Sequence, residues 1–155
     1  MPKVSINILT KNREELLQKA LASVSTQTFN EYEIVVVNDG SSDNTSEILK
    51  SFNHLNIKSL NHSSSAGITL SRQEALHAST GEYVAILDDD AEWIDTDKLQ
   101  KQVDYLNNHP DTVLVGGGIV INPKYEILNS IQLLNIKFQT AKSRPETNKQ
   151  IRNTI

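Results

Sequence analysis

Three consecutive aspartates, Asp88, Asp89 and Asp90, follow directly on a largely apolar segment, residues 82–87. Ionised carboxylates this close repel one another, and ordinary packing does not readily satisfy three of them. A cation at this point would stabilise them. Mg²⁺ and Mn²⁺ are hard ions that prefer carboxylate oxygens and usually keep ligand phosphates in their coordination shell. The triplet therefore indicates a divalent metal site, and the alternative is a solvated acidic turn before the next helix.

Polar residues also follow two other expected strands. The sequence Thr-Lys-Asn-Arg at residues 10–13 comes after a strand expected over residues 4–9, and Asp39 comes after a β-branched strand expected over residues 33–37. A carboxylate at such a turn accepts hydrogen bonds from ligand N–H or O–H groups, or else caps the turn. Arg72 is placed to contact phosphate oxygens or the acidic triplet, with an ordinary helix-surface arginine as the alternative.

Strands and helices alternate through the first 121 residues. The last helix is expected over residues 96–108, and strands are expected over residues 4–9, 33–37, 57–60, 83–87 and 112–115, the last continuing through 119–121. This alternation predicts βαβ units and a mostly parallel sheet with helices on both faces. Ligands of such sheets bind beyond the carboxyl ends of the strands. The polar clusters after the first, second and fourth strands are therefore expected to meet in one place.

Local patterns give expectations for single residues. Asn12 is predicted to cap the first helix, with Glu15 in the capping-box position. The 3.6-residue spacing predicts that this helix buries Leu16, Leu17, Ala20, Leu21 and Val24. Trp93, the single tryptophan, is expected to anchor packing, with a substrate platform as the alternative. No ligand spacing is seen, and no role is assigned, for the four histidines, His54, His62, His77 and His109.

Composition and charge exclude several classes of function. The 155 residues suffice for one domain with a core, and 37% hydrophobic with 22% charged residues is typical of a soluble globular protein. A formal net charge of −4 argues against a nucleic-acid binder. The chain has no cysteine, which excludes disulfides and thiolate chemistry. No apolar stretch resembles a signal peptide or a transmembrane segment, so we expect a cytoplasmic protein, with peripheral attachment at the inner face of the membrane left open.

Several familiar motifs are missing from the sequence. It has no G-x-x-x-x-G-K-[ST] loop, no G-x-G-x-x-G after the first expected strand and no G-x-S-x-G elbow. The glycines at residues 116–118 come too late in the chain for a dinucleotide fingerprint. A receiver domain pairs acids at the end of its first strand, where this chain has Thr10, Lys11 and Asn12.

Four segments together resemble the amino-terminal part of a family 2, GT-A-type glycosyltransferase. Residues 4–13 resemble the family's opening strand and polar turn, and residues 32–45 resemble its most recognisable segment. Residues 67–75 are similar to the loop and helix before the metal strand, and residues 80–90 are similar to the segment that carries the D-x-D motif. The order and spacing match over about residues 3–121.

The resemblance implies a Rossmann-like GT-A three-layer sandwich with a mostly parallel central sheet. Residues 1–121 would form the nucleotide-sugar-binding half, and residues 122–155 would begin an incomplete acceptor-side segment. By motif position, Asp90 would coordinate Mn²⁺ or Mg²⁺ between two phosphates, with Asp88 as a second metal ligand near the ribose. The implied nucleotide-binding set is Thr10, Asn12, Arg13, Asp39, Gly67, Arg72, Asp88 and Asp89.

The family also implies the partners of the chain. Its donor would be a nucleotide-sugar, with a UDP-sugar favoured, and its acceptor a glycan or a lipid-linked sugar. Thr10 and Asp39 would hold the base and the ribose, and Arg72 would lie near the base or the diphosphate. Leu9 and Lys11 stand where the family usually has proline and an aromatic residue, which changes the surface available for base stacking.

In inverting members of the family, an Asp or Glu of the acceptor half deprotonates the acceptor hydroxyl. Residues 122–155 contain only the isolated Glu126 and Glu146. We therefore expect a truncated chain, the donor-binding part of a metal-dependent glycosyltransferase, prone to self-association and poor at transfer alone. The alternative is a non-catalytic nucleotide- or nucleotide-sugar-binding module that works with a partner chain. A sugar nucleotidyltransferase is disfavoured, because its glycine-rich, arginine-containing first loop is absent.

Overall fold

A computed structural model describes residues 1–116 and 136–137 of the chain. Strands and helices alternate in the order β1 (Val4–Thr10), α1 (Glu14–Ser25), β2 (Tyr32–Asn38), α2 (Thr45–Ser51), β3 (Ile57–Asn61), α3 (Ile68–Ala78), β4 (Tyr83–Ile86), α4 (Lys98–Asn108) and β5 (Ile136–Lys137). The strands form one sheet in the order β3-β2-β1-β4-β5. The first four strands are parallel, and β5 pairs with β4 in the antiparallel direction. This architecture confirms the predicted α/β fold with a mostly parallel sheet.

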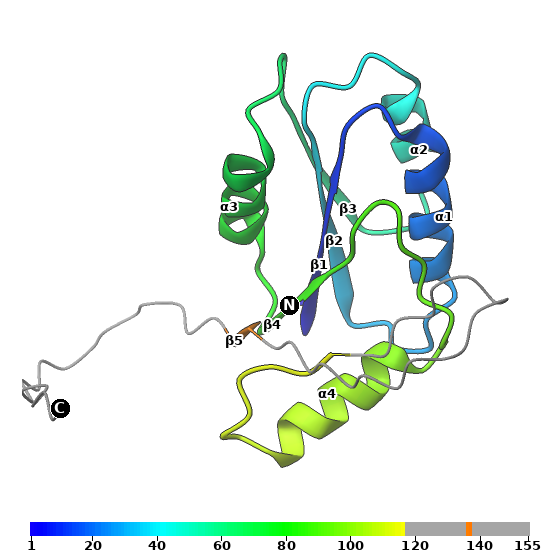
Figure 1. Ribbon diagram of the computed structural model, residues 1–155. Coiled ribbons are helices and arrows are strands. Elements are labelled where there is room, and N and C mark those ends of the chain that lie inside the picture. Colours follow the sequence, from blue (N-terminus) through cyan, green and yellow to red (C-terminus); the bar gives the residue numbers. More distant parts are fainter. Residues whose placement is uncertain (117–135, 138–155) are drawn as a thin grey trace, which may run out of the picture.

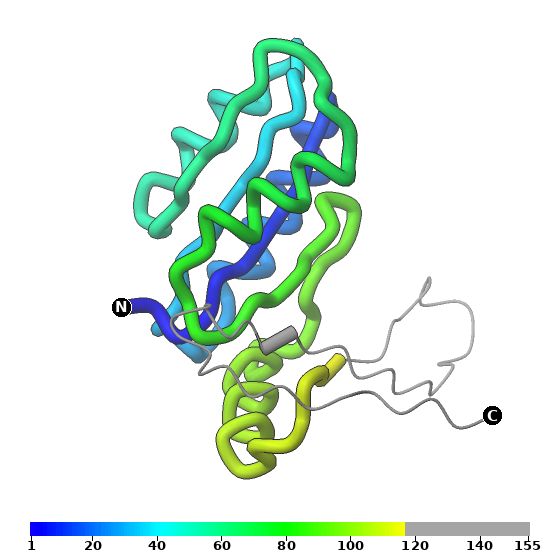
Figure 2. The backbone as a smooth tube through the Cα atoms, turned by 90° about the vertical axis from the view of Figure 1, so that its left-hand side faces the viewer, coloured from blue at the N-terminus to red at the C-terminus, as the bar shows by residue number. Residues whose placement is uncertain are grey.

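The helices form layers on both faces of the sheet. Helix α3 covers one face, and α1 and α2 cover the other (Figure 1). Helix α4 lies beyond the amino ends of the strands, as both views of the backbone show (Figures 1 and 2). None of the helices in the described part of the chain is long and apolar enough to cross a membrane.

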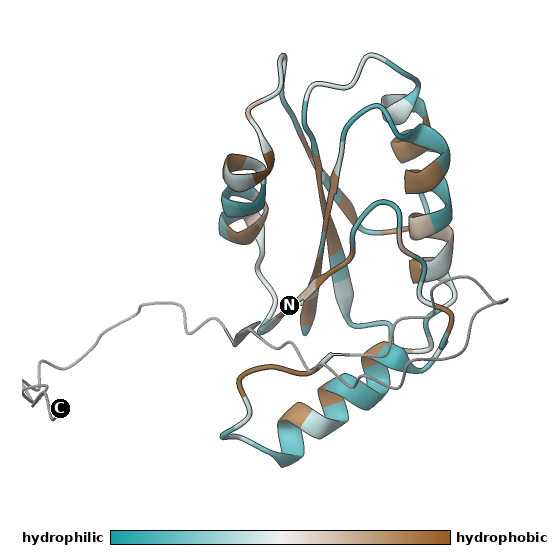
Figure 3. Cartoon of the chain, in the orientation of Figure 1, coloured by the Kyte–Doolittle hydropathy of each residue, from teal (hydrophilic) through white to brown (hydrophobic). Residues whose placement is uncertain are grey.

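The middle of strand β2 is apolar, which suits a sheet that is covered on both faces. Along β2, Ile34 and Val36 join the large core under α1, while Val35 and Val37 pack with Ala75 of α3. All four β2 residues are fully buried, and burial of each such side chain contributes about 1.5–3 kcal/mol. The brown middle of β2 in Figure 3 corresponds to this apolar run. The β-branched run of β2 thus forms the interior strand that its composition predicted.

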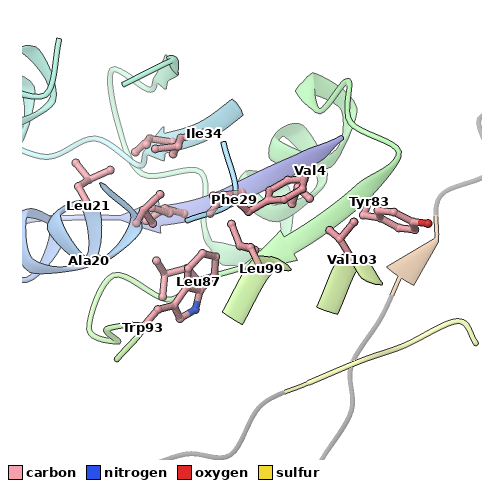
Figure 4. Packing of buried hydrophobic residues seen from close by; sticks show 14 of the residues in the cluster. Val4, Ala20, Leu21, Phe29, Ile34, Tyr83, Leu87, Trp93, Leu99 and Val103 are labelled. Atoms are coloured by element: carbon pink, nitrogen blue, oxygen red, sulfur yellow. The ribbon is translucent and has the colours of Figure 1, made fainter. Parts of the chain in front are cut away.

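The segment after the acidic triplet is anchored by Trp93. Its indole is buried near Leu87 and Leu99 in the main core (Figure 4). The Trp93 backbone N–H donates to Ser23 Oγ of α1 at 3.0 Å, and Lys98 Nζ lies 4.1 Å from the ring centroid. The predicted packing role of Trp93 is confirmed, and this anchor fixes where the chain goes once it has passed the triplet.

Two local expectations for α1 are wrong. The helix begins at Glu14, its N-cap residue is Arg13, and no side chain caps it. Asn12 instead has φ of 51°, and its side-chain oxygen accepts a hydrogen bond from Ser42 N–H at 2.8 Å. Asparagine tolerates this left-handed conformation, so the turn uses Asn12 to join the loops after β1 and β2. Leu16 is 36% exposed, because the buried stripe of α1 follows Leu17, Ala20, Leu21 and Val24.

The prediction of a strand over residues 112–115 is also wrong. These residues form no strand, and Thr112 N–H closes a turn on His109 O at 2.9 Å. Val113 is exposed and Val115 is buried, whereas residues two apart in a strand point to the same face, so this segment does not have the burial pattern of a strand. The position beside β4 belongs to β5. The expected continuation over residues 119–121 lies outside the described residues, as does nearly all of the expected segment 122–155.

Two glycines with positive φ shape the loops at the carboxyl edge of the sheet. Gly40 has φ of +74° and Gly67 has φ of +89°. A Cβ atom on Gly40 would lie 2.8 Å from the backbone of both Ser64 and Ser65, whereas one on Gly67 would meet nothing within 4 Å. Gly40 therefore meets two constraints, backbone conformation and close approach, and Gly67 meets only the first.

This difference makes the two glycines a matched pair. We expect Gly67→Ala to lower the free energy of unfolding by about 1–3 kcal/mol, the strain of an unfavourable φ. Gly40→Ala should lower it by about 2–6 kcal/mol, because overpacking against the backbone of residues 64–65 adds to that strain. Urea unfolding of both variants measures the two values. Equal destabilisation by the two substitutions would contradict the close approach of these loops.

Candidate functional site

A pocket of about 510 Å³ opens at the carboxyl edge of the sheet. The turns that follow β1, β2 and β3 gather at that edge, at the top of Figure 1. The pocket is lined by Leu9, Thr10, Lys11, Arg13, Asp39, Ile68, Ser71, Arg72, Asp88, Asp89 and Asp90. Seven of the residues named from the sequence thus meet there: Thr10, Arg13, Asp39, Arg72 and the three aspartates. Two others, Asn12 and Gly67, are not among the lining residues and instead hold the loops around it.

Two arginines neutralise the acidic triplet. Arg13 Nη1 lies 2.9 Å from Asp89 Oδ1 and 3.2 Å from Asp90 Oδ2. Arg72 Nη2 lies 3.3 Å from Asp88 Oδ1. The Asp89 side chain is 7% exposed, whereas those of Asp88 and Asp90 are 65% and 55% exposed. The middle carboxylate is therefore a buried ion-pair partner, and the outer two present oxygens to the pocket.

The exposed carboxylates have the chemistry of a shared metal site. Mg²⁺ and Mn²⁺ are commonly bound by one or two carboxylates, with substrate phosphates completing the shell. Asp88 and Asp90 provide such a pair. Across residues 1–116, no group of three or more His, Asp or Glu side chains is arranged to hold a metal ion by itself. The donor set therefore fits an ion that arrives with a phosphate ligand better than one held in a closed protein cage.

Asp39 is held differently from the triplet. Its Oδ1 accepts hydrogen bonds from Ala66 N–H at 2.7 Å and from the His62 ring at 2.7 Å. Its Oδ2 accepts from Ser65 Oγ–H at 2.6 Å and from Gly67 N–H at 3.1 Å. The Ser65 and His62 bonds are the main cause of a pKa far below the ordinary aspartate range. A carboxylate has about four lone-pair sites. The four donors of loop 62–67 therefore occupy the hydrogen-bond acceptor sites of the Asp39 carboxylate.

Sequence reasoning missed His62. The ring lies between Asp39 and Glu74, with Nδ1 2.7 Å from Asp39 Oδ1 and Nε2 2.6 Å from Glu74 Oε2. A signal for it existed, because β2 and β3 are parallel and Asn38 is in register with Asn61. The residues that follow these two strands, Asp39 and His62, must therefore be neighbours. Applied to the third strand, the strand-end rule predicts His62 at the same edge as Asp39.

Two buried hydroxyls beside the pocket are unpaired. Thr10 Oγ1 and Ser71 Oγ are shielded from solvent and have no hydrogen-bond partner within the described residues. Both residues line the pocket, Thr10 from the end of β1 and Ser71 from the first turns of α3. An unsatisfied buried hydroxyl costs about 1–3 kcal/mol. Such groups are therefore informative at a cavity wall, because a ligand can supply the missing partner.

Comparison with known proteins identifies the family. The family model described as "Glycosyl transferase family 2" matches residues 5–153. The UDP-Glc:alpha-D-GlcNAc-diphosphoundecaprenol beta-1,3-glucosyltransferase WfgD of Escherichia coli is 32% identical over 119 residues, which is 77% of this chain and 47% of that protein. The chain therefore spans about half the length of this curated relative.

Solved structures give the same result for the fold. The crystal structure of S. aureus TarS 1-349 in complex with UDP-GlcNAc superposes with a TM-score of 0.69 at 28% identity, covering 77% of this chain and 37% of that one. The mannosyltransferase PcManGT of Pyrobaculum calidifontis, in complex with GDP-Man and Mn²⁺, also gives 0.69 at 27% identity, covering 79% and 36%. This chain therefore belongs to glycosyltransferase family 2 and has the family's GT-A-type α/β fold.

Proposed function

We propose that this chain is the donor-binding part of a glycosyltransferase that binds a nucleotide-diphospho-sugar together with Mg²⁺ or Mn²⁺. The observation that carries the proposal is the meeting of four kinds of group in one pocket. Two exposed carboxylates can bind a metal ion that is shared with the ligand, and two arginines can bind phosphate. Two buried hydroxyls lack a hydrogen-bond partner within the described residues, and the loop around Asp39 forms one wall of the pocket. A nucleoside diphosphate carries the complementary groups for all of these.

The diphosphate would be the leaving group of the reaction. In sugar transfer the bond between the anomeric carbon and the diphosphate oxygen breaks, and an acceptor hydroxyl oxygen forms the new bond and loses its proton. Asp90 and Asp88 would hold the divalent ion, which supplies positive charge to the departing diphosphate. Arg13 and Arg72 are close enough to the triplet to contact the same phosphates.

The nucleoside would occupy the wall formed by Thr10, Ser71 and the Asp39 loop. The hydroxyls of Thr10 and Ser71 would bond the base or the ribose, and the loop would fix the shape of the wall. A UDP-sugar is our proposed donor. The supporting observation is the complex of the similar TarS structure with UDP-GlcNAc, while the GDP-Man complex of PcManGT makes GDP-sugars the comparison to test.

An acceptor hydroxyl needs a general base to take its proton. The carboxylates that line the pocket are Asp39, which four donors saturate, and the triplet, which the two arginines neutralise. In the described part of the chain, the pocket thus offers no unengaged carboxylate as a general base. This favours donor binding with little transfer, and it keeps a non-catalytic nucleotide-sugar-binding module with a partner chain as the second candidate.

The proposed acceptor is a glycan or a lipid-linked sugar. The name of the relative WfgD specifies a diphosphoundecaprenol acceptor, which is a lipid-linked sugar at a membrane. By analogy, we propose that this protein works in the cytoplasm at a membrane surface. Flotation with vesicles that contain a polyprenyl diphosphate sugar, compared with plain phospholipid vesicles, distinguishes this from a freely diffusing acceptor.

Removal of the Asp90 charge tests the metal site. We expect Asp90→Asn to weaken Mg²⁺-dependent UDP binding at least about tenfold, or 1.4 kcal/mol, because the ion loses one of its carboxylate ligands. Asp104→Asn, an exposed acid on α4, is the matched control and should bind UDP as the parent does. Calorimetric titrations with and without Mg²⁺ measure both effects. Unchanged Mg²⁺-dependent affinity for UDP in Asp90→Asn would show that Asp90 is not a metal ligand.

The unpaired hydroxyls lead to an opposed effect on stability and binding. We expect Ser71→Ala and Thr10→Val each to raise the free energy of unfolding by about 1 kcal/mol, because each removes an unsatisfied buried group. Each should also weaken UDP binding by about 0.5–1.5 kcal/mol, because a ligand hydrogen bond is lost.

The control for these two variants is Thr45→Val. The Thr45 hydroxyl is buried but donates to Asp43 Oδ1 at 2.6 Å, away from the pocket. Its loss should lower stability and leave UDP affinity unchanged. Thermal unfolding and calorimetry measure the two quantities for all three variants. Lower stability in Ser71→Ala and Thr10→Val would mean that their hydroxyls are not unsatisfied in the free chain.

A transfer assay separates the two candidate functions. We expect the 155-residue chain to bind UDP-glucose and to transfer almost no sugar, because a positioned general base contributes about 10²- to 10⁴-fold in rate. Radiolabelled donor, supplied with glycan and lipid-linked acceptors, measures transfer and donor hydrolysis side by side. Efficient transfer by this chain alone would exclude both the donor-only role and the non-catalytic module.

A further inference from the structure

His62 is held between two carboxylates at the wall of the pocket. Its side chain is 15% exposed, and its two ring nitrogens lie 2.7 Å from Asp39 Oδ1 and 2.6 Å from Glu74 Oε2. Asp39 follows β2, His62 follows β3, and Glu74 is on α3, so the contact joins three elements. Nothing in the D-x-D cluster or in the arginine pairs touches this group.

The geometry determines the charge of the ring. A neutral imidazole has one N–H donor and one lone pair, so one of its nitrogens would face a carboxylate oxygen with no hydrogen between them. Only the imidazolium donates from both nitrogens. Consistent with this, the hydrogen bond to Asp39, followed by that to Glu74, raises the pKa of His62 above its ordinary value.

The charge of His62 affects a loop that faces the ligand. Asp39 lines the 510 Å³ pocket, while His62 and Glu74 line a neighbouring hollow of about 560 Å³ together with His77. Of the four groups that donate to Asp39, His62 is the single cation, and the other three come from residues 65–67. The ring therefore connects a solvent-facing acid, Glu74, to the carboxylate that orders the pocket wall.

We propose that His62 is a positioning residue of the nucleotide site, whose protonated ring, held by Glu74, fixes the Asp39 carboxylate and with it loop 62–67. Loss of the ring proton leaves a lone pair against one carboxylate and loosens the loop. The part of this proposal that concerns ligand binding rests on the proposed nucleotide-sugar function. The part that concerns the order of the loop does not.

The pH dependence follows from the groups that face the ring. These are Asp39 from the turn after β2, and Glu74 and His77 from α3. Because protonation is favoured in the folded chain, the stabilisation is complete below the ordinary histidine pKa of about 6.5 and is lost as the pH rises through the higher folded value. His77 lines the same hollow without a hydrogen bond to Asp39, and so provides the control.

The first experiment measures the order of the loop without any ligand. Protection factors of the Ala66 and Gly67 amides, both donors to Asp39, are followed by hydrogen exchange from pH 5.5 to 9 in the full chain. We expect protection to fall at a midpoint above about pH 6.5. His62→Gln should reduce protection at least about tenfold below that midpoint and abolish the pH dependence, since a hydrogen bond to a charged group is lost.

Two further variants separate positioning from simple structural damage. Glu74→Gln keeps a side-chain acceptor but removes a negative charge, so the midpoint should move to lower pH while the loop stays ordered in acid. His77→Gln should reproduce the parent curve. An unchanged midpoint in Glu74→Gln, or a lost midpoint in His77→Gln, would overturn the proposal. Glu74 is partly exposed, so this test stands even if His62→Gln fails to fold.

The second experiment adds UDP-glucose and Mg²⁺. The diphosphate of this probe carries the sugar and does not titrate near neutral pH, so a change in affinity reports on the protein. Affinity should fall with the same midpoint as amide protection in the parent, and be low and independent of pH in His62→Gln. Equal affinity of parent and His62→Gln across the range would overturn the positioning role. Normal loop behaviour with no binding to the parent would instead contradict the proposed function alone.

Discussion

The parallel pairing of β1 with both β2 and β4 is the constraint on which the site depends. Because the three strands run in the same direction, the residues that follow them emerge at one edge of the sheet. Thr10, Asp39 and the triplet at residues 88–90 are far apart in the chain, yet they line one pocket. The pairing is stabilised by fully buried apolar side chains, of which Ile6 and Ile34 are directly in register. The polar groups at the edge are therefore positioned largely by the packing of apolar side chains in the interior of the sheet.

Two kinds of carboxylate meet at this edge, and their surroundings suit different tasks. Asp39 accepts four hydrogen bonds from one loop, and its pKa is held far below the ordinary range by the Ser65 and His62 bonds. It is a fixed charge around which backbone is organised. Asp88 and Asp90 are more than half exposed and are paired with arginine. Exposed ion pairs of this kind contribute only about 0–1 kcal/mol, so their partners can be exchanged at little cost.

The sequence predicted well what depends on periodicity and strand direction. The β-branched run that became β2 and the convergence of three polar turns both follow from local pattern and one topological rule. Prediction from the sequence failed where the local residue types fit more than one structure. Val113 and Val115 are β-branched residues that favour a strand by type, but only tertiary pairing decides which segment lies beside β4. Asn12 fits a helix cap by type, yet its amide joins two loops that local sequence cannot relate. The contact of His62 with Asp39 follows from the parallel pairing of β2 and β3, whereas its contact with Glu74 depends on how α3 packs against the sheet, which local sequence does not specify.

The difference between the two kinds of carboxylate also decides how a diphosphate could enter the pocket. An incoming anion and the acidic triplet compete for the same arginines, Arg13 and Arg72, while a divalent ion and those arginines compete for the same carboxylates. If both exchanges occurred together, a divalent ion would pair with Asp88 and Asp90, Asp89 would keep Arg13, and the diphosphate would gain Arg72 and the ion as cationic partners. Binding of metal or diphosphate alone would satisfy only one side of this exchange. Under the proposed function, the arrangement therefore favours cooperative entry of metal and diphosphate, whereas Asp39 is held by donors of its own that do not belong to the triplet or its arginines.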